Sequence, residues 1–340
     1  MMTNIKGYQN VLVHAEMHGE DLAPITRELL IIGRKLADGM GYQSVACLII
    51  GSIAPGVAEK LFALGVDEIH QVNHPLLAEF HPDIYTQAVV KACQIVRPMV
   101  FLLGHTDLGS EIGPRVAARL GTNIFTSCID IHAADNGKLP IYVRPVYGGK
   151  AIAEVVSSSC PQIATLRPKS TIAAPLDRST DRSAEGKITT LAVELEDSLT
   201  GPKLVETMQE EHSGIKLEDA RVIVCGGGGI GSADDFKVLR LLADVLGGVV
   251  GVTRVPCDEG WMHLSQEIGQ TGKIVSPDLY IAIGVSGAPQ HIAGCLGSKR
   301  IVAINRDPDA PIFRVSDFGI VGDYREILPI LIEECKRASL

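Results

Sequence analysis

The first half of the chain alternates short, almost fully apolar runs with segments whose apolar residues recur every three or four positions. Apolar runs of this kind are typical of strands buried on both faces, and the longer period is typical of amphipathic helices. The runs predict strands at residues 11–15, 45–50, 68–72, 99–104 and 163–167, and the periodic segments predict helices at residues 24–39, 57–64, 82–96 and 110–120. This alternation predicts βαβ units and a parallel sheet. Residues 141–155 interrupt it, which indicates an antiparallel excursion or an edge loop.

A second alternating unit begins at Arg221. Its pattern predicts strands at residues 221–225, 249–253, 279–284, 300–304 and 319–322, and helices near residues 233–246, 290–294 and 324–338. Residues 168–187 are rich in Pro, Ser, Asp and Ala, and residues 206–219 are dominated by charge, so both segments are expected to be connectors. We therefore expect an α/β protein with two domains and largely parallel sheets, at residues 1–205 and 220–340, with a linker at 206–219.

A glycine run follows the first strand of the second unit. Gly226, Gly228 and Gly231 fit the pattern GxGxxG between a predicted strand and a predicted helix, where backbone without Cβ atoms can approach a pyrophosphate. The next strand ends at Thr253-Arg254, without an acidic residue for a ribose diol. Two alternatives stay open: an NADP site that uses Arg254, and a turn that only packs the helix closely on the strand.

Polar residues also stand at the carboxyl ends of the predicted strands in this unit: Thr253 and Arg254, Ser286, Asn305, and Asp323. Carboxyl ends of parallel strands meet at one edge of a sheet, which is where ligands of open α/β folds bind. The glycine-bearing turns at residues 269–272 and 284–287 are expected to present free N–H groups at the same edge. The sequence therefore predicts one ligand site there.

Composition and charge exclude several classes of function. A net charge of −9, without any run of five basic residues, argues against a nucleic-acid partner. No stretch of 18 apolar residues and no export signal is present, so we expect no membrane insertion and a cytoplasmic location. The eight cysteines include no CxxC pair and are expected to be reduced. The residues suggest neither a metal site nor a catalytic nucleophile.

Several stretches resemble the α subunit of electron-transfer flavoproteins. They are Arg254 with CDEG at 257–260, IGQTGK at 268–273, YIAIGVSGA at 280–288 with Gln290 and His291, and AIN at 303–305. In the first half, PRVAAR at 114–119 and Arg144-Pro145 with Gly148-Gly149 look like the N-terminal domain of that family. The resemblance spans the chain and implies a nucleotide-α-hydrolase-like N-terminal domain and a Rossmann-like, FAD-binding C-terminal domain.

The resemblance also implies a cofactor, its contacts and partners. The cofactor is FAD, the N-terminal domain forms an interface with a β subunit, and the heterodimer exchanges electrons with a dehydrogenase of the acyl-CoA type, with electron bifurcation as a further option. The implied FAD contacts are Thr253, Arg254, Ile268, Gly269, Gln270, Thr271, Ser286, Gly287, Ala288, Gln290, His291, Asn305 and Asp323. A soluble NADP-dependent oxidoreductase and a nucleotide-binding regulatory module remain the alternative functions.

The sequence also predicts which residues bring charge to the flavin site. Many members of the family carry an arginine in the glycine run where this chain has Gly228, so backbone N–H groups are expected to replace that ion pair. Arg254 and His291 are expected to place positive charge beside the flavin and to stabilise its reduced form. Glu267 would bring a negative charge toward the same place.

Overall fold

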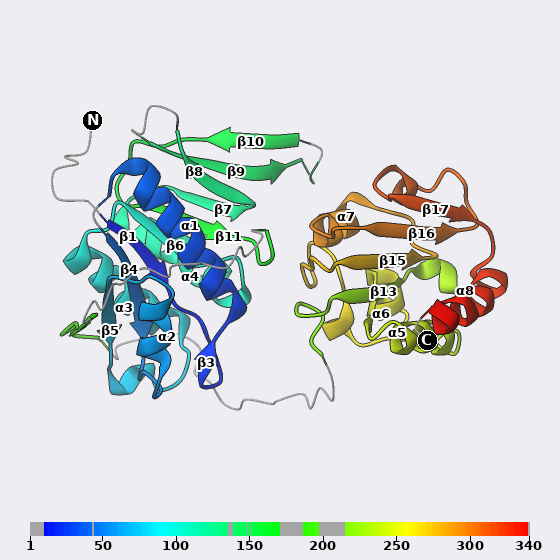
Figure 1. The fold of residues 1–340 in the computed structure, drawn as a ribbon, viewed down its shortest axis with the longest axis horizontal. Helices are drawn as coiled ribbons and strands as arrows, with labels where there is room; N and C mark the ends of the chain where they lie inside the picture. Colours follow the sequence, from blue (N-terminus) through cyan, green and yellow to red (C-terminus); the bar gives the residue numbers. More distant parts are fainter. Residues whose placement is uncertain are drawn as a thin grey trace. The chain divides into compact units, whose positions relative to one another are not determined.

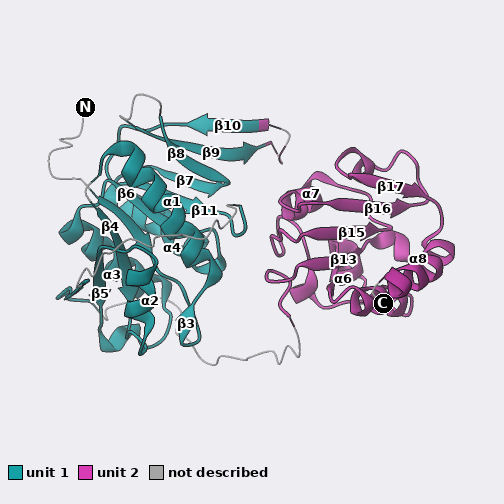
Figure 2. Cartoon of the chain, viewed as in Figure 1, with its two compact units in different colours: residues 1–146, 152–207 teal, residues 147–151, 208–340 magenta. Residues whose placement is uncertain are grey.

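The computed structural model describes residues 10–42, 44–134, 139–147, 149, 151–170, 186–196 and 215–338. The chain divides into two compact units: unit 1 is Met1–Val146 with Ile152–Thr207, and unit 2 is Tyr147–Ala151 with Met208–Leu340 (Figures 1 and 2). Most of the expected connector at 168–187 and of the expected linker at 206–219 lies outside the described residues.

Unit 1 is built on a parallel sheet of seven strands in the order β12-β5-β4-β1-β6-β11-β7 (Figure 1). Unit 1 as a whole, with its smaller sheets, contains the strands β1 (Asn10–His14), β2 (Met17–His18), β3 (Asp21–Leu22), β4 (Ser44–Ile50), β5 (Glu68–Val72), β6 (Val100–Gly104), β7 (Ile124–Cys128), β8 (Asp130–Ala133), β9 (Pro140–Val146), β10 (Ala151–Val155), β11 (Gln162–Leu166) and β12 (Lys187–Thr190). Its helices are α1 (Pro24–Met40), α2 (Val57–Ala63), α3 (Pro82–Val96) and α4 (Asp107–Leu120).

Both faces of this sheet are covered, which explains the uninterrupted apolar runs. Successive side chains of a strand point to opposite faces, and in β1 Val11 and Val13 pack into the core formed with α1 and α2. Leu12 packs into the second core, formed with α3 and α4. The parallel βαβ prediction for this unit is confirmed.

Three features of unit 1 differ from the expectation or refine it. Strands β7, β8 and β12 were not predicted, because their sequences mix polar residues with apolar ones. The antiparallel excursion expected around residues 141–155 is found in β9, which pairs antiparallel with β8 in a three-stranded sheet of order β10-β9-β8. Helix α4 begins before Ser110, since the Thr106 hydroxyl accepts a 3.1 Å hydrogen bond from the Gly109 N–H and caps the first turn.

Unit 2 contains a parallel sheet of five strands in the order β14-β13-β15-β16-β17 (Figure 1). The strands are β13 (Val222–Gly226), β14 (Val249–Val252), β15 (Leu279–Ile283), β16 (Ile301–Asn305) and β17 (Phe318–Val321), and the helices are α5 (Phe236–Val245), α6 (Arg254–Asp258), α7 (Pro289–Cys295) and α8 (Tyr324–Ala338). Helices α5 and α8 contribute to the core on one face, and Cys295 of α7 contributes to the core on the other. Helix α6, which was not predicted, begins directly after β14.

None of the helices that the structure describes is both long enough and apolar enough to cross a lipid bilayer.

Candidate functional site

The predicted polar strand ends of unit 2 lie along one edge of its sheet. Thr253 and Arg254 follow β14 at one end of the strand order, and Asp323 follows β17 at the other. Ser286 comes shortly after β15, and Asn305 ends β16. Four spacings of about 4.8 Å separate the outer strands, so the edge is about 19 Å long. An edge of this length suits an extended ligand better than a compact one.

The loop after β15 is held in a tight turn by its neighbours. The Asn305 side-chain amide donates a 2.8 Å hydrogen bond to the carbonyl of Val285. Gly287 has φ +82°, and a Cβ atom there would lie 2.2 Å from the Ile312 backbone nitrogen, so glycine is required. Among the described residues, the N–H groups of Ser286 and Gly287 have no hydrogen-bond partner. The loop therefore offers two unused donors beside the exposed Ser286 side chain.

The turn at residues 268–273 is fastened to helix α7. The Gln270 N–H donates a 2.8 Å hydrogen bond to the Gln290 carbonyl. Gly294 approaches the turn so closely that a Cβ atom on it would lie 2.5 Å from the Gly269 nitrogen. These contacts bring the two sequence-distant groups of predicted site residues together.

His291 lies underneath this turn and does not have a free nitrogen. Its Nδ1 lies 2.8 Å from the Ile268 carbonyl oxygen, and its Nε2 lies 3.0 Å from the Tyr280 hydroxyl. A carbonyl oxygen can only accept, so Nδ1 carries a proton, and when the ring is neutral Nε2 accepts from the Tyr280 hydroxyl. Burial lowers the pKa of His291, which is 6% exposed. The expected positive charge is therefore corrected: burial favours the neutral form of His291, and both of its ring nitrogens are already engaged.

Arg254 is exposed and shared between two acids. Its Nε donates a 2.7 Å hydrogen bond to Asp258 one helical turn later. Its Nη1 lies 3.7 Å from Oε2 of Glu267, a side chain that is 2% exposed. The other Glu267 oxygen accepts a 2.7 Å hydrogen bond from the Thr271 hydroxyl. The guanidinium expected to be a free cation of the site is thus already paired.

Asp323 has a structural task at the far end of the edge. It accepts a 2.9 Å hydrogen bond from the Arg325 N–H in the first turn of α8, and it lies 3.9 Å from Arg306. Asp323 therefore caps the helix that follows β17. Its half-buried carboxylate still borders the sheet edge.

The glycine run packs two loops against each other. The N–H groups of Gly227 and Gly229 donate to the carbonyls of Ile283 and Gly284, at 2.9 and 3.0 Å. A Cβ atom on Gly227 would lie 2.3 Å from the Gly284 oxygen. Of the two alternatives left open by the sequence, this geometry favours the packing turn, because these two N–H groups are not available to a pyrophosphate.

Exposure divides the predicted site residues into two groups. Side chains or loop tips that a ligand can reach belong to Thr253, Arg254, Gln270, Thr271, Ser286, Ala288, Gln290, Asn305 and Asp323, which are exposed or half-buried. The buried residues that shape the loops are Ile268, Gly269, Gly287 and His291. Sequence reasoning missed Tyr280, whose only signal was a polar atom inside an otherwise apolar strand.

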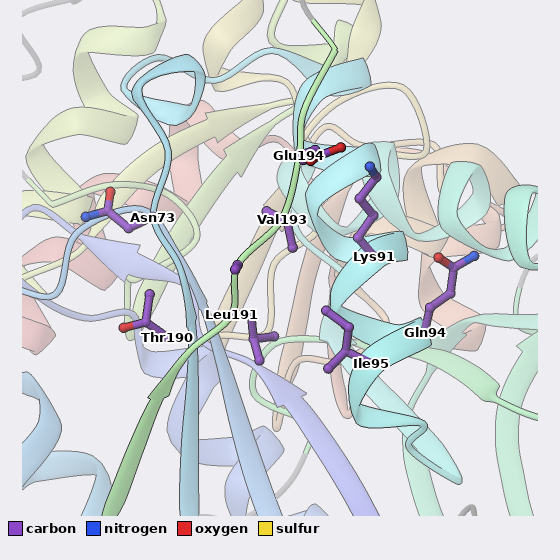
Figure 3. Close-up of a pocket in the computed structure, with 9 residues that line it drawn as sticks. Asn73, Lys91, Gln94, Ile95, Thr190, Leu191, Val193 and Glu194 are labelled. Atoms are coloured by element: carbon purple, nitrogen blue, oxygen red, sulfur yellow. The ribbon is translucent and has the colours of Figure 1, made fainter.

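A separate cavity of about 630 Å³ lies in unit 1 (Figure 3). Figure 3 shows α3, with Lys91, Gln94 and Ile95, on one side of the cavity, the chain segment from Thr190 to Glu194 beside it, and Asn73 beyond that segment. No predicted site residue lines this cavity. Among the described residues, no cluster of three or more His, Cys, Asp or Glu side chains is arranged to hold a metal ion.

Comparison with known proteins shows which family the chain belongs to. Residues 11–196 match the electron transfer flavoprotein domain, and residues 216–296 match the electron transfer flavoprotein FAD-binding domain. The electron transfer flavoprotein subunit alpha of Thermoanaerobacterium thermosaccharolyticum is 38% identical over 331 residues, which cover 97% of this chain and 98% of that protein. The chain belongs to the electron transfer flavoprotein alpha-subunit family.

Two further relatives of the alpha-subunit family have the same extent. The electron transfer flavoprotein subunit alpha of Bacillus subtilis is 37% identical, over 98% of this chain and 99% of that protein. A protein named FixB from Clostridium saccharobutylicum is 37% identical, over 98% of both chains. The resemblance seen in the sequence and the two-domain α/β fold are thereby confirmed. The match to the FAD-binding domain includes Thr253, the 268–273 turn and His291, whereas Asn305 and Asp323 lie beyond it.

Proposed function

We propose that this chain binds FAD along the carboxyl edge of the unit 2 sheet and carries electrons as one subunit of a cytoplasmic heterodimer. Its partner subunit is an electron transfer flavoprotein beta subunit, and its redox partner is a dehydrogenase of the acyl-CoA type. The observation that supports the proposal most is the pair of loops at 268–273 and 284–291, which lie within the FAD-binding match and expose side chains at one edge. FAD supplies an isoalloxazine ring that takes up and releases electrons one or two at a time.

The residues at this edge fit such a molecule. Two unclaimed N–H groups, at Ser286 and Gly287, suit phosphate or carbonyl oxygens. The exposed polar side chains of Gln270, Thr271 and Gln290 suit the hydroxyls and ring edges of a dinucleotide. The length of the edge, about 19 Å, suits an extended molecule.

Each group of residues has a distinct task in this proposal. Ser286 and Gly287 bind FAD through their backbone N–H groups, which the turn at Gly287 keeps in place. Gln270 and Thr271 bind from the opposite loop, which the Gln290 carbonyl and the His291 ring hold in position. Arg254, with Asp258 and Glu267, sets the local charge.

The test is co-expression with an electron transfer flavoprotein beta subunit, followed by a visible spectrum of the purified heterodimer. We expect a yellow protein that an acyl-CoA dehydrogenase and its substrate reduce. Counting the flavins bound per heterodimer then decides whether the heterodimer can carry out electron bifurcation, since that chemistry needs a second flavin. A colourless heterodimer that binds no added FAD would refute the proposal.

A site variant ties the flavin to unit 2. Ser286→Asp puts a carboxylate beside the two unused donors, and we expect FAD affinity to fall by about tenfold or more because like charges repel there. Leu241→Asp, on the exposed side of α5, adds the same charge elsewhere in unit 2 and is expected to leave affinity unchanged.

A further inference from the structure

One carboxylate in unit 2 is buried without full compensation. Glu267 is 2% exposed, and among the described residues its Oε2 has no hydrogen-bond partner. The other oxygen has a single neutral donor, the Thr271 hydroxyl, at 2.7 Å. Burying a carboxylate is costly unless it is paired and hydrogen-bonded, so this arrangement calls for an explanation.

The backbone fixes Glu267 beside the residues proposed to bind FAD. Glu267 forms an isolated parallel bridge with Val252, the last residue of β14. The Ile268 N–H donates a 2.8 Å hydrogen bond to the Val252 carbonyl. Glu267 therefore adjoins the end of β14, where Thr253 and Arg254 begin α6, and it cannot move away from the edge without breaking these bonds.

The cation nearest to Glu267 is shared with a second acid. Arg254 Nη1 is 3.7 Å from Oε2, beyond hydrogen-bonding distance, while Arg254 Nε is bound to Asp258 at 2.7 Å. The charge of Lys273, which follows in the same turn, is met by Glu218 at 2.8 Å. Burial lowers the pKa of His291, the other neighbour expected to be positive, and this favours its neutral ring, whose two nitrogens are already hydrogen-bonded. One arginine therefore faces two acids, and the local balance is negative.

We propose that Glu267 is a positioning residue that holds incompletely compensated negative charge in the flavin site and thereby lowers the reduction potential of the bound flavin. The inference rests on the proposed function. Reduction adds negative charge to the ring, and a fixed carboxylate in a region of low dielectric disfavours that charge even without contact. The effect is opposite in sign to the one that Arg254 and His291 lead one to expect from sequence.

The test is Glu267→Gln in the heterodimer with the beta subunit, with FAD occupancy measured first and the midpoint potential measured by spectroelectrochemical titration. Gln keeps the shape and an acceptor for Thr271 but removes the charge. We expect the preference for reduced over oxidised flavin to rise about tenfold, which for a two-electron couple is about +30 mV. Asp258→Asn is the matched control, because it removes the other carboxylate that pairs with Arg254. The Asp258 side chain is 56% exposed, so solvent screens its charge.

Salt distinguishes the two variants further. At 1 M salt the Debye length is about 3 Å, so any shift from Asp258→Asn should vanish while the shift from Glu267→Gln persists. Full FAD occupancy with an unchanged or lowered potential in Glu267→Gln would overturn the inference. Removing a buried charge that lacks a full set of partners relieves a burial cost, so a Glu267→Gln protein that does not fold would also count against the inference. A parent heterodimer without FAD would instead refute the proposed function.

Discussion

The hydrogen bond between Tyr280 and His291 can be removed by deleting one atom, the Tyr280 hydroxyl oxygen. Tyr280 is fully buried in β15, and its hydroxyl lies 3.0 Å from Nε2 of His291. Tyr280→Phe deletes the donor and leaves the ring shape unchanged. Nε2 then remains buried as an acceptor without a partner, because Nδ1 continues to donate to the Ile268 carbonyl at 2.8 Å.

The expected cost follows from that unpaired acceptor. Leaving a buried polar group without a hydrogen bond costs about 1–3 kcal/mol. For a domain of this size, 1 kcal/mol corresponds to about 4 °C, so the melting temperature of unit 2 should fall by about 4–12 °C. The 268–273 turn should loosen as well, because the ring that holds the Ile268 carbonyl loses its second anchor, and FAD affinity should therefore fall without a loss of any direct contact.

The assay combines thermal unfolding with nitrogen-15 NMR of the histidine side chains, which reports the tautomer. The parent should show His291 protonated at Nδ1. Tyr85→Phe is the control, since among the described residues the Tyr85 hydroxyl has no hydrogen-bond partner, and we expect its stability to change by less than about 0.5 kcal/mol. Equal melting temperatures for parent and Tyr280→Phe, or a parent His291 protonated only at Nε2, would refute this account of the ring.

Three further outcomes are expected. Arg254→Ala removes the cation between two acids and should lower the flavin potential by about 30 mV, a tenfold change in relative affinity; an unchanged potential with FAD bound would make Arg254 purely structural. Burial lowers the pKa of His14 to about 4 from 6.5, so between these pH values the unfolded chain binds a proton that the folded chain does not. The free energy of unfolding should therefore fall by about 3 kcal/mol between pH 6.5 and pH 4. Urea titrations should find a smaller loss in His14→Gln. Gly227→Ala drives a Cβ atom to 2.3 Å from a backbone oxygen and should cost about 2 kcal/mol or more, whereas Gly228→Ala meets only the Val255 side chain at 3.0 Å and should cost less than about 1 kcal/mol by the same titration.

Much of the fold could be predicted because burial on both faces leaves a clear mark in the sequence. Strands such as β1 and β4 are continuous apolar runs, and the structure gives them within one residue of the predicted bounds. Strand β7 could not be predicted in this way, because its residues Thr126 and Ser127 are polar and only half-buried. Helix α6 has five residues, too few for any period to show.

The candidate site divides along the same physical line. Polar residues at strand ends could be predicted to share an edge, because parallel strands align their carboxyl ends. The contacts between loops could not. The Tyr280–His291 bond joins a strand to the helix after it, and the Gln270–Gln290 bond joins residues twenty positions apart. No local pattern encodes such pairings, since they depend on how closely two turns approach.

The sign of the site's charge illustrates why residue type alone is a poor guide to electrostatics. Arg254 and His291 count as cations in the sequence, yet one is shared between acids and the other is neutral in its buried surroundings. Once α6 is known, the spacing of four between Arg254 and Asp258 predicts their ion pair. Glu267 is thirteen residues from Arg254 and reaches it only through the bridge to Val252. A flavin potential is set by the sum over such pairs, so it follows from the backbone pairing of β14 with the Glu267 turn as much as from the residues that would contact the ring.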